Sequence, residues 1–539
     1  MARCEKGGTA VPRDFQRPGR SPVIAENGMA ATSHPLATMT AVQVLRDGGN
    51  AIDAAIAAAA TLAVVEPHMT GIGGDCFALV AKPDGSTFGL DGAGRAASAA
   101  RTEWYVERGF TEIPSHSPHA VTVPGAVKAW HTLLAVGGTM ELPRLFADAL
   151  RYAEEGYAVA PRVAHDWAKQ TATLRADEGA SLHFLYQGEA PLAGQRHRQP
   201  ALARTLRAIS QDGADAFYTG PVAEEIARTV QAKGGFLSQD DLAAVTTGFV
   251  DPLSIDYAGH ALMELPPSGQ GIVAMIMLNI LEQIGVREHA PDSPARYHCE
   301  MEAARLAYSV RDILLAEPEH MPVPASTLIS SKYAEGLAAQ FSAGRRNDRI
   351  AIPAIPDSDT VYLTVVDRDR MAVSFINSLY GAFGSQIVTP ESGIALQNRG
   401  ACFVTDPAHP NVIAPSKRPL HTIIPAMVAR NGEAAISFGV MGGSYQPVGH
   451  AHLLSNMLDY GMDPQEAIDH PRMFWDDEGV IRGEAGIEPA VLEGMSALGH
   501  ETAPAEAPFG GGQAIAIDRE SGFLVGGSDP RKDGCAMGW

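Results

Sequence analysis

The feature that most constrains the fold is a run of alternating, largely β-branched residues from Thr360 to Val366, which follows a loop of proline and aspartate. Both sets of alternating positions are mostly apolar, so the run predicts a strand that is buried on both faces. The charged segment 367–370 predicts a turn into a second strand, residues 371–376. A threonine hydroxyl therefore lies at the first position of a core strand.

Thr360 would acquire a particular chemistry if the chain were cut on its amino side, after Asp359. The new α-amine would lie beside the hydroxyl of the same threonine, which places a base and a nucleophile in one residue. An α-amino group has a pKa of about 7.7–8, so it accepts a proton at neutral pH without a histidine. Thr360 is therefore a candidate nucleophile that cleavage of the chain would expose.

The composition fits a globular enzyme that acts on small molecules. The 539 residues are 45% hydrophobic and 19% charged, which permits a sizeable core, and the length alone suggests three or four domains unless large α/β layers absorb it. The net charge is −21 and the isoelectric point is near 5.3. Nucleic acids and anionic membranes need clustered lysine and arginine, so both are excluded as partners.

The patterns that often mark metal or cofactor sites are weak in this chain. The five cysteines are odd in number and scattered, which excludes a disulfide set or a CxxC metal site. His450 and His452 are two apart on a predicted helix, so their rings diverge. The glycines of 71–74 follow a predicted helix and precede a strand, the reverse of the order in a dinucleotide loop. We expect no metal and no cofactor.

The apolar stretches predict buried helices and no membrane segment. Residues 1–22 carry charges and prolines throughout and lack the apolar centre of a secretory signal. The longest apolar stretch, 51–65, is interrupted by Asp53 and is too short to cross a bilayer. We therefore expect a cytoplasmic protein in which 51–65 forms an enclosed helix.

The remaining segments before Thr360 predict a supporting structure. Residues 143–286 have a mostly helical pattern, with strands near 249–257 and 261–265, and offer no convergent acid, base and nucleophile. Residues 342–349 are the most polar and least periodic in the chain. They predict an exposed, mobile loop, which would suit a segment that is released by cleavage.

Two further features are candidate binding groups. Arg101 precedes Trp104 and Tyr105 and could hold a substrate carboxylate in a fork, although a surface salt bridge is the alternative. Residues 441–444, Met-Gly-Gly-Ser, lie between a predicted strand and a helix that begins near Pro447. Free N–H groups at such a place can hold an anion or an oxyanion, and an ordinary helix entry is the alternative.

An ordered set of motifs resembles the γ-glutamyltranspeptidase family, whose members are N-terminal-nucleophile hydrolases made as one precursor. The similar segments cover nearly the whole chain: 33–37, 48–55, 65–68, 71–74, 123–125, 391–394, 415–419 and 442–443. The resemblance implies an α/β fold, a four-layer α/β/β/α sandwich. It also implies self-cleavage into a large subunit, 1–359, and a small subunit, 360–539, which remain together as a heterodimer. Further dimerisation stays open.

The resemblance also implies roles for individual residues. Thr360 would be the nucleophile, assisted by a hydroxyl at Ser378, and the N–H groups of Gly442 and Gly443 would form the oxyanion hole. The resemblance also implies substrate contacts. Arg101 lies at or within one position of a carboxylate-binding arginine of the family. His421 and Thr422 stand in place of a serine pair, and Tyr380 stands in place of an asparagine.

One departure from the family pattern bears on the substrate. Family members bind the α-ammonium of a glutamyl substrate with a glutamine and an aspartate. At these positions this chain has Arg399 and Cys402. A guanidinium repels an ammonium and suits a substrate with a carboxylate alone.

Three functions remain open on these grounds. The first is cleavage of a γ-glutamyl-type amide through a threonine acyl-enzyme, with hydrolysis or transfer of the acyl group. The second is hydrolysis of a small acidic amide, since a branch of the family with a similar 397–400 loop includes oxamate amidohydrolase; acylases of the cephalosporin type are another branch, without a specific mark here. The third, of a different class, is an unprocessed binding protein.

Overall fold

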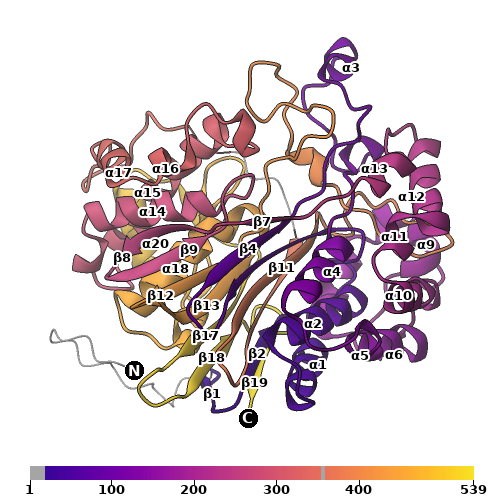
Figure 1. Ribbon diagram of the computed structural model, residues 1–539. Helices are drawn as coiled ribbons and strands as arrows, with labels where there is room; N and C mark the ends of the chain where they lie inside the picture. Colours follow the sequence, from indigo (N-terminus) through magenta and orange to yellow (C-terminus); the bar gives the residue numbers. More distant parts are fainter. Residues whose placement is uncertain (1–18, 352, 354–358) are drawn as a thin grey trace.

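The fold is built around two facing seven-stranded sheets (Figure 1). The computed structural model describes residues 19–351, 353 and 359–539. The predicted threonine strand is β10 (Asp359–Val366), and it lies in the interior of one of these sheets beside β11 (Ala372–Tyr380). Their antiparallel register is regular from Val361 onward and shifts between Asp359 and Val361, at Thr360 itself.

The sheet that contains β10 has the strand order β19-β2-β10-β11-β3-β4-β7. Its other members are β19 (Cys535–Gly538), β2 (Met29–Thr32), β3 (Asp75–Ala81), β4 (Thr87–Gly92) and β7 (Gly248–Val250). Every residue of β11 and β3 is buried, as expected for strands that are covered on both faces.

The second sheet has the order β1-β18-β17-β13-β12-β9-β8. Its members are β1 (Val23–Ala25), β18 (Leu524–Ser528), β17 (Gly511–Ile517), β13 (Glu433–Met441), β12 (Ala426–Arg430), β9 (His260–Glu264) and β8 (Leu253–Tyr257). All adjacent pairs in this sheet are antiparallel. Both sheets combine strands from before and after Thr360.

Contacts between the sheets align β10 with β13. The Thr364 hydroxyl donates to Ser437 Oγ over 2.6 Å, and the Tyr362 ring fills the space where a side chain on Gly439 would lie. From the first pair to the second, the position in β10 moves two residues back while the position in β13 moves two residues forward. The two strands therefore run in opposite directions across the interface. Extending this spacing by two residues places Thr360 opposite Met441, the last residue before the Gly442-Gly443 turn.

Helices cover the outer face of each sheet. The β10 sheet is covered by α1 (Pro35–Arg46), the fully buried α2 (Ala51–Val65) and α4 (Ala126–Gly137). The other sheet is covered by α14 (Gly271–Gln283), α15 (Pro294–Leu314) and α18 (Gln446–Leu458). These layers make the predicted α/β/β/α sandwich, and they confirm the enclosed helix at 51–65.

Further helices extend the covering layers (Figure 1). They are α3 (Thr102–Glu107), α5 (Leu142–Leu145), α6 (Ala147–Glu155), α7 (Pro161–Lys169), α8 (Thr171–Leu174), α9 (Glu178–Phe184), α10 (Pro200–Asp212), α11 (Asp215–Tyr218), α12 (Gly220–Ala232), α13 (Gln239–Ala243), α16 (Ala325–Leu328), α17 (Ser331–Ala338), α19 (Pro464–Asp469) and α20 (Pro489–Ala497). Short strands β5 (Tyr157–Ala158) and β6 (Arg196–His197) pair together, and β14 (Met473–Trp475), β15 (Ile481–Gly483) and β16 (Thr502–Pro504) form a small third sheet. Among the described residues, no helix is both long and apolar enough to span a membrane.

The loop at 342–349 is less detached than its composition predicts. Arg346 N–H donates to Leu498 O, and Asn347 N–H donates to the buried Glu302 carboxylate. Arg305 holds Ile350 O over 2.6 Å. Backbone N–H groups of this loop therefore anchor it to the end of α20 and to α15, and the expectation of a wholly exposed loop was wrong for Ser342, Arg346 and Asn347, which are half-buried.

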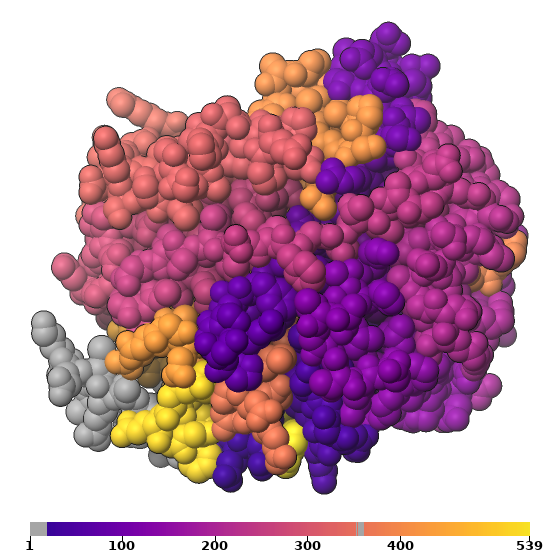
Figure 2. All heavy atoms as spheres, in the orientation of Figure 1, coloured from indigo at the N-terminus to yellow at the C-terminus, as the bar shows by residue number. Residues whose placement is uncertain are grey.

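The two parts of the chain are interleaved at the surface as well as in the sheets. Figure 2 shows the orange and yellow surface of the C-terminal part between the indigo and magenta surface of the N-terminal part. The segments before and after Thr360 both contribute to each of the two hydrophobic clusters, so separating them would expose the interior of both sheets.

Candidate active site

The hydroxyls of Thr360 and Ser378 lie 3.1 Å apart, and both residues are fully buried. Ser378 is on β11, beside the start of β10. Its Oγ accepts hydrogen bonds from Tyr380 N–H over 2.9 Å and from Arg399 Nη2 over 3.3 Å. Arg399, Tyr380 and Thr360 therefore all contact the Ser378 hydroxyl, and either hydroxyl of the Thr360–Ser378 pair can donate to the other.

Arg399 places a buried positive charge next to this pair. It lies in the short 3₁₀ helix 399–402, has no exposed surface, and donates through Nη1 to Thr422 Oγ1 over 2.7 Å. Its guanidinium stacks on the Tyr380 ring, 4.3 Å from the ring centre. Among the described residues no carboxylate forms an ion pair with Arg399, and its Nε has no hydrogen-bond partner. A buried guanidinium in this state can hold an anion, and the predicted role of Arg399 in substrate binding stays a prediction.

Asp75 is the acidic residue whose pKa Arg399 influences. Burial raises the pKa of Asp75 to about 6, against the lowering effect of Arg399, of Gln397 and of two backbone N–H groups. Its Oδ1 accepts from Gly94 N–H, Gly125 N–H and Gln397 Nε2, and its Oδ2 pairs with His421 Nε2 over 3.0 Å. The carboxylate is therefore occupied by these donors.

His421 is held as a neutral imidazole within this network. Burial, followed by the charge of Arg399, lowers the pKa of His421 well below its usual value. Its Nδ1 accepts from Ile423 N–H over 3.3 Å, which leaves the proton on Nε2 for Asp75. The ring also packs on Phe77, 4.6 Å between centres. His421 thus fixes the loop that carries Thr422.

The Gly442-Gly443 turn presents two backbone N–H groups at the end of β13. Both glycines have positive φ, 125° and 54°, a conformation that side chains disfavour. The carbonyls of Gly442 and Gly443 accept from Tyr445 and Gln446 N–H. Within the described part of the chain, neither glycine N–H donates to an acceptor. By the facing alignment of β10 and β13, the turn directly follows the residue opposite Thr360, and its role as an oxyanion hole stays a prediction.

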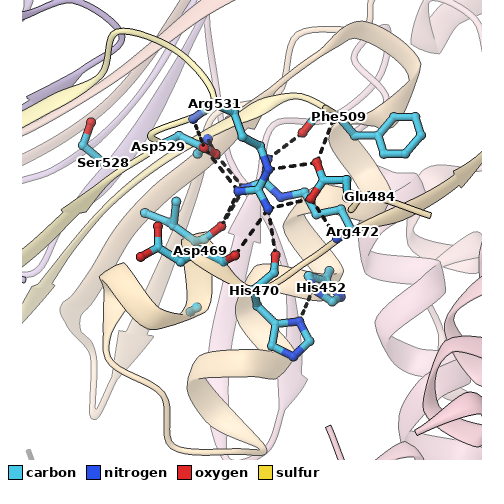
Figure 3. Close-up of polar contacts among 12 residues, drawn as sticks. His452, Asp469, His470, Arg472, Glu484, Phe509, Ser528, Asp529 and Arg531 are labelled. Atoms are coloured by element: carbon cyan, nitrogen blue, oxygen red, sulfur yellow. Dashed lines mark hydrogen bonds and ion pairs between the residues drawn. The ribbon is translucent and has the colours of Figure 1, made fainter. Parts of the chain in front are cut away.

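A charged cluster supports the turn from behind (Figure 3). Arg531 binds the Glu484 carboxylate with two bonds of 2.8 and 2.6 Å, and Arg472 binds Asp529 over 2.7 Å. These side chains hold the backbone of Phe509, through Glu484 Oε1 and Arg472 Nη1, at 2.9 and 2.6 Å.

The segment that this cluster holds packs directly on the turn. A Cβ on Gly442 would lie 2.8 Å from Gly510 Cα, so the two backbones are in contact. The Phe509 ring also stacks on Tyr445, which follows the turn. Moving the Phe509 segment would therefore displace Gly442.

The structure brings most of the predicted site residues together. Thr360, Ser378, Tyr380, Arg399 and Thr422 form one connected set. The side chain of Asp359, at the predicted cleavage point, lies outside the described residues.

Arg101 is placed apart from this set. It is an exposed residue at the N-terminus of α3, and its side chain makes no hydrogen bond or ion pair with the described residues. Among the described residues Arg101 forms no surface salt bridge, and a role in carboxylate binding stays a prediction.

Sequence reasoning missed three residues of the site: Asp75, Gln397 and Gln270. The region 143–286 was expected to be scaffold, yet Gln270 Nε2 donates to Thr422 O and Gly443 O, both over 2.9 Å. The signal for Asp75 was its place directly after the glycines of 71–74, at the start of a buried strand. The prediction that the rings of His450 and His452 diverge was confirmed, since the two rings bond to different buried carboxylates, Glu264 and Glu300.

Comparisons with known proteins agree with this geometry. The family model described as gamma-glutamyltranspeptidase matches residues 37–539. The chain is 37% identical to the oxamate amidohydrolase proenzyme of Klebsiella pneumoniae over 96% of this chain and 99% of that protein. It is 36% identical to the glutathione hydrolase-like YwrD proenzyme of Bacillus subtilis, with the same coverage of both.

A solved structure extends the comparison to three dimensions. The cephalosporin acylase from Bacillus halodurans superposes with a TM-score of 0.92 at 38% identity, over 99% of each chain. The four-layer fold with a threonine at the head of a central strand defines an N-terminal-nucleophile hydrolase. Within that class, the chain belongs to the gamma-glutamyltranspeptidase family, and it is an enzyme.

Proposed function

We propose that this enzyme cleaves itself before Thr360 and then hydrolyses a small amide that carries a carboxylate next to the scissile carbonyl, as oxamate does. The observation that carries the proposal is Arg399: its guanidinium is fully buried and bonds to Ser378, which in turn contacts Thr360. A substrate carboxylate on Arg399 would bring the adjacent carbonyl to the threonine hydroxyl. The relative named for oxamate supports this assignment.

The reaction follows from the groups around Thr360. The hydroxyl oxygen attacks the amide carbon while its proton passes to the α-amine of the same residue. The N–H groups of Gly442 and Gly443 bind the developing oxyanion, and the intermediate collapses with transfer of the proton to the leaving nitrogen, which departs as ammonia. Water then attacks the threonine ester and releases the acid; from oxamate, the products are oxalate and ammonium.

A γ-glutamyl substrate is the second candidate, favoured by the relative named as glutathione hydrolase-like. Its α-ammonium would require a carboxylate in the pocket. Near Arg399 the described acid is Asp75, and its oxygens are already bonded to Gly94, Gly125, Gln397 and His421. Desolvating an ammonium beside Arg399 is therefore unfavourable, and we rank this substrate second.

The test compares oxamate with a γ-glutamyl anilide on the processed enzyme and on two variants, Arg399→Gln and Arg399→Lys. We expect wild type to prefer oxamate. Loss of a charge-assisted, bidentate contact should lower kcat/KM for oxamate by ~10- to 100-fold in Arg399→Gln, with partial retention in Arg399→Lys. Activity on the anilide should stay level or rise in Arg399→Gln. A wild type that hydrolyses only the anilide, and loses that activity in Arg399→Gln, would contradict the proposal.

The proposed assembly follows from the interleaved sheets. Cleavage before Thr360 would leave a large fragment, 1–359, and a small fragment, 360–539, that share both sheets and remain associated. We place the enzyme in the cytoplasm and propose a small acidic amide as its partner, without nucleic acid.

A further inference from the structure

Gln270 connects two loops of the site that come from different places in the chain. It is fully buried at the start of α14 and donates from one amide nitrogen to Thr422 O and to Gly443 O. The first carbonyl belongs to the loop that holds Arg399 through the Thr422 hydroxyl. The second belongs to the Gly442-Gly443 turn, the proposed oxyanion hole. A single side chain thus spans the carboxylate site and the oxyanion turn.

The orientation of the Gln270 amide is fixed by its other partner. Its Oε1 accepts from Arg311 Nη1 over 3.3 Å, and an arginine can only donate. The nitrogen must therefore face the two carbonyls, which can only accept. Gln270 N–H also donates to His421 O, and His421 N–H donates to Ser268 O, so the backbone of this segment is joined to the same loop.

Tyr308 provides a natural comparison because, among the described residues, its hydroxyl bonds to one of the two loops and not to the other. It is buried on α15, its hydroxyl donates to Ser444 O, and the guanidinium of Arg311 lies 4.4 Å from the centre of its ring. Gln270 and Tyr308 therefore hold consecutive carbonyls of one turn from the same side. Since peptide groups are planar, these two contacts fix the peptide groups that follow Gly443 and Ser444, and so they hold the C-terminal side of the Gly442-Gly443 turn in place.

We propose that Gln270 is a positioning residue that couples carboxylate binding at Arg399 to the oxyanion turn, across the boundary between the two predicted fragments. Gln270 and Arg311 precede Thr360 in the chain, whereas Thr422 and Gly443 follow it. The inference rests on the proposed function for the roles of Arg399 and of the turn. Its consequence is that one substitution in the large fragment alters both binding and turnover.

The experiment compares Gln270→Met with Tyr308→Phe, each purified after processing. Gln270→Met keeps the volume and removes the donors, so kcat should fall ~10- to 100-fold, less than removal of an oxyanion donor itself costs. KM should rise about 5- to 10-fold, as expected when a hydrogen bond that orders the Thr422 loop is lost. Tyr308→Phe should lower kcat with KM unchanged, since it contacts the turn alone.

The control is Asn279→Leu on the same helix, whose amide donates to Ile329 O within the large fragment. Its kinetics should match wild type. Should Gln270→Met fail to fold, Gln270→Asn, which keeps the amide but shortens its reach, gives the same readouts. The proposal is overturned if Gln270→Met keeps kcat within about twofold, if its KM does not change, or if Asn279→Leu loses as much.

Failure of this proposal is distinguishable from failure of the proposed function. The kcat and KM of each variant are compared with those of the wild type on whichever amide the wild type hydrolyses, oxamate or the γ-glutamyl anilide. Self-cleavage of the precursor uses the same turn and needs no added substrate, so its half-time should lengthen in Gln270→Met and in Tyr308→Phe even if both compounds prove inert. Unchanged half-times together with unchanged kcat would refute the coupling alone.

Discussion

Ser378 Oγ lies 3.1 Å from Thr360 Oγ1 and receives N–H groups from two other residues. This relationship places Ser378 between Arg399 and Thr360, with its hydroxyl within hydrogen-bond distance of the reacting oxygen. It also predicts the consequence of removing the hydroxyl.

Ser378→Ala should slow hydrolysis by ~10- to 100-fold in kcat, because the threonine oxygen loses a hydrogen bond that is worth most while charge develops on it. Self-cleavage should slow as well, since it uses the same oxygen. Steady-state assays and gel analysis of the precursor measure the two effects. Ser374→Ala is the matched control: Ser374 lies on the same strand and bonds to Tyr362 over 2.7 Å. Equal losses in both variants would contradict a specific role for Ser378.

The pH dependence of the enzyme's activity should reflect the ionisation of the Asp75 carboxyl. Its pKa of about 6 means that the carboxyl is ionised above that pH and gains a proton below it. Protonation removes an acceptor from the N–H groups of Gly94, Gly125 and His421, so activity falls as pH decreases. The Thr360 α-amine, with an ordinary pKa of about 7.7–8, must also be deprotonated.

Log kcat/KM should therefore fall with slope one below the amine pKa and with slope two below about pH 6. Asp75→Asn should have a lower plateau and a slope of one throughout, because its side chain does not titrate. A wild-type slope that remains one in the acidic range would show that the ionisation of Asp75 does not affect the reaction.

The cluster behind the oxyanion turn should matter for stability and turnover together. Glu484→Gln breaks the paired bonds with Arg531, and breaking a buried ion pair lowers the free energy of unfolding by about 3 kcal/mol. It also loosens Phe509, so kcat should decrease at temperatures where the enzyme is still folded. Urea unfolding and kcat at 25 °C measure the two effects.

The control for Glu484→Gln is Arg482→Gln, in an ion pair with Asp476 on the surface of the same small sheet. That pair is half-buried at the surface, so a smaller loss of stability than in Glu484→Gln is expected. A stable Glu484→Gln enzyme with wild-type kcat would show that the cluster does not position the turn.

The sequence predicted the fold where its patterns are strong. The alternating run after Thr360 and the alanine-rich stretch 51–65 each fix an element by periodicity, and both were confirmed. The loop 342–349 was misjudged because a hydrogen bond to a distant residue, as from Arg346 to Leu498 O, leaves no local signal.

Only part of the site could be predicted, because contacts to residues distant in the chain leave no local signal in the sequence. Thr360, Ser378 and Arg399 lie in recognisable motifs, and the contacts among them agree with those motifs. Gln270 was missed because its importance arises from two backbone carbonyls more than 150 positions later in the chain. A carbonyl acceptor carries no residue-type signature, so only the fold reveals such a contact.

The central claim is that the chain severs itself to make Thr360 a terminus. The most direct measurement is N-terminal sequencing with intact mass analysis of the active enzyme, beside the Thr360→Ala variant. We predict two fragments in the active material, one beginning Thr-Val-Tyr-Leu, and a single 56.9 kDa chain in the variant. An intact wild-type chain that still hydrolyses its amide substrate, or a variant that is processed normally, would contradict the account.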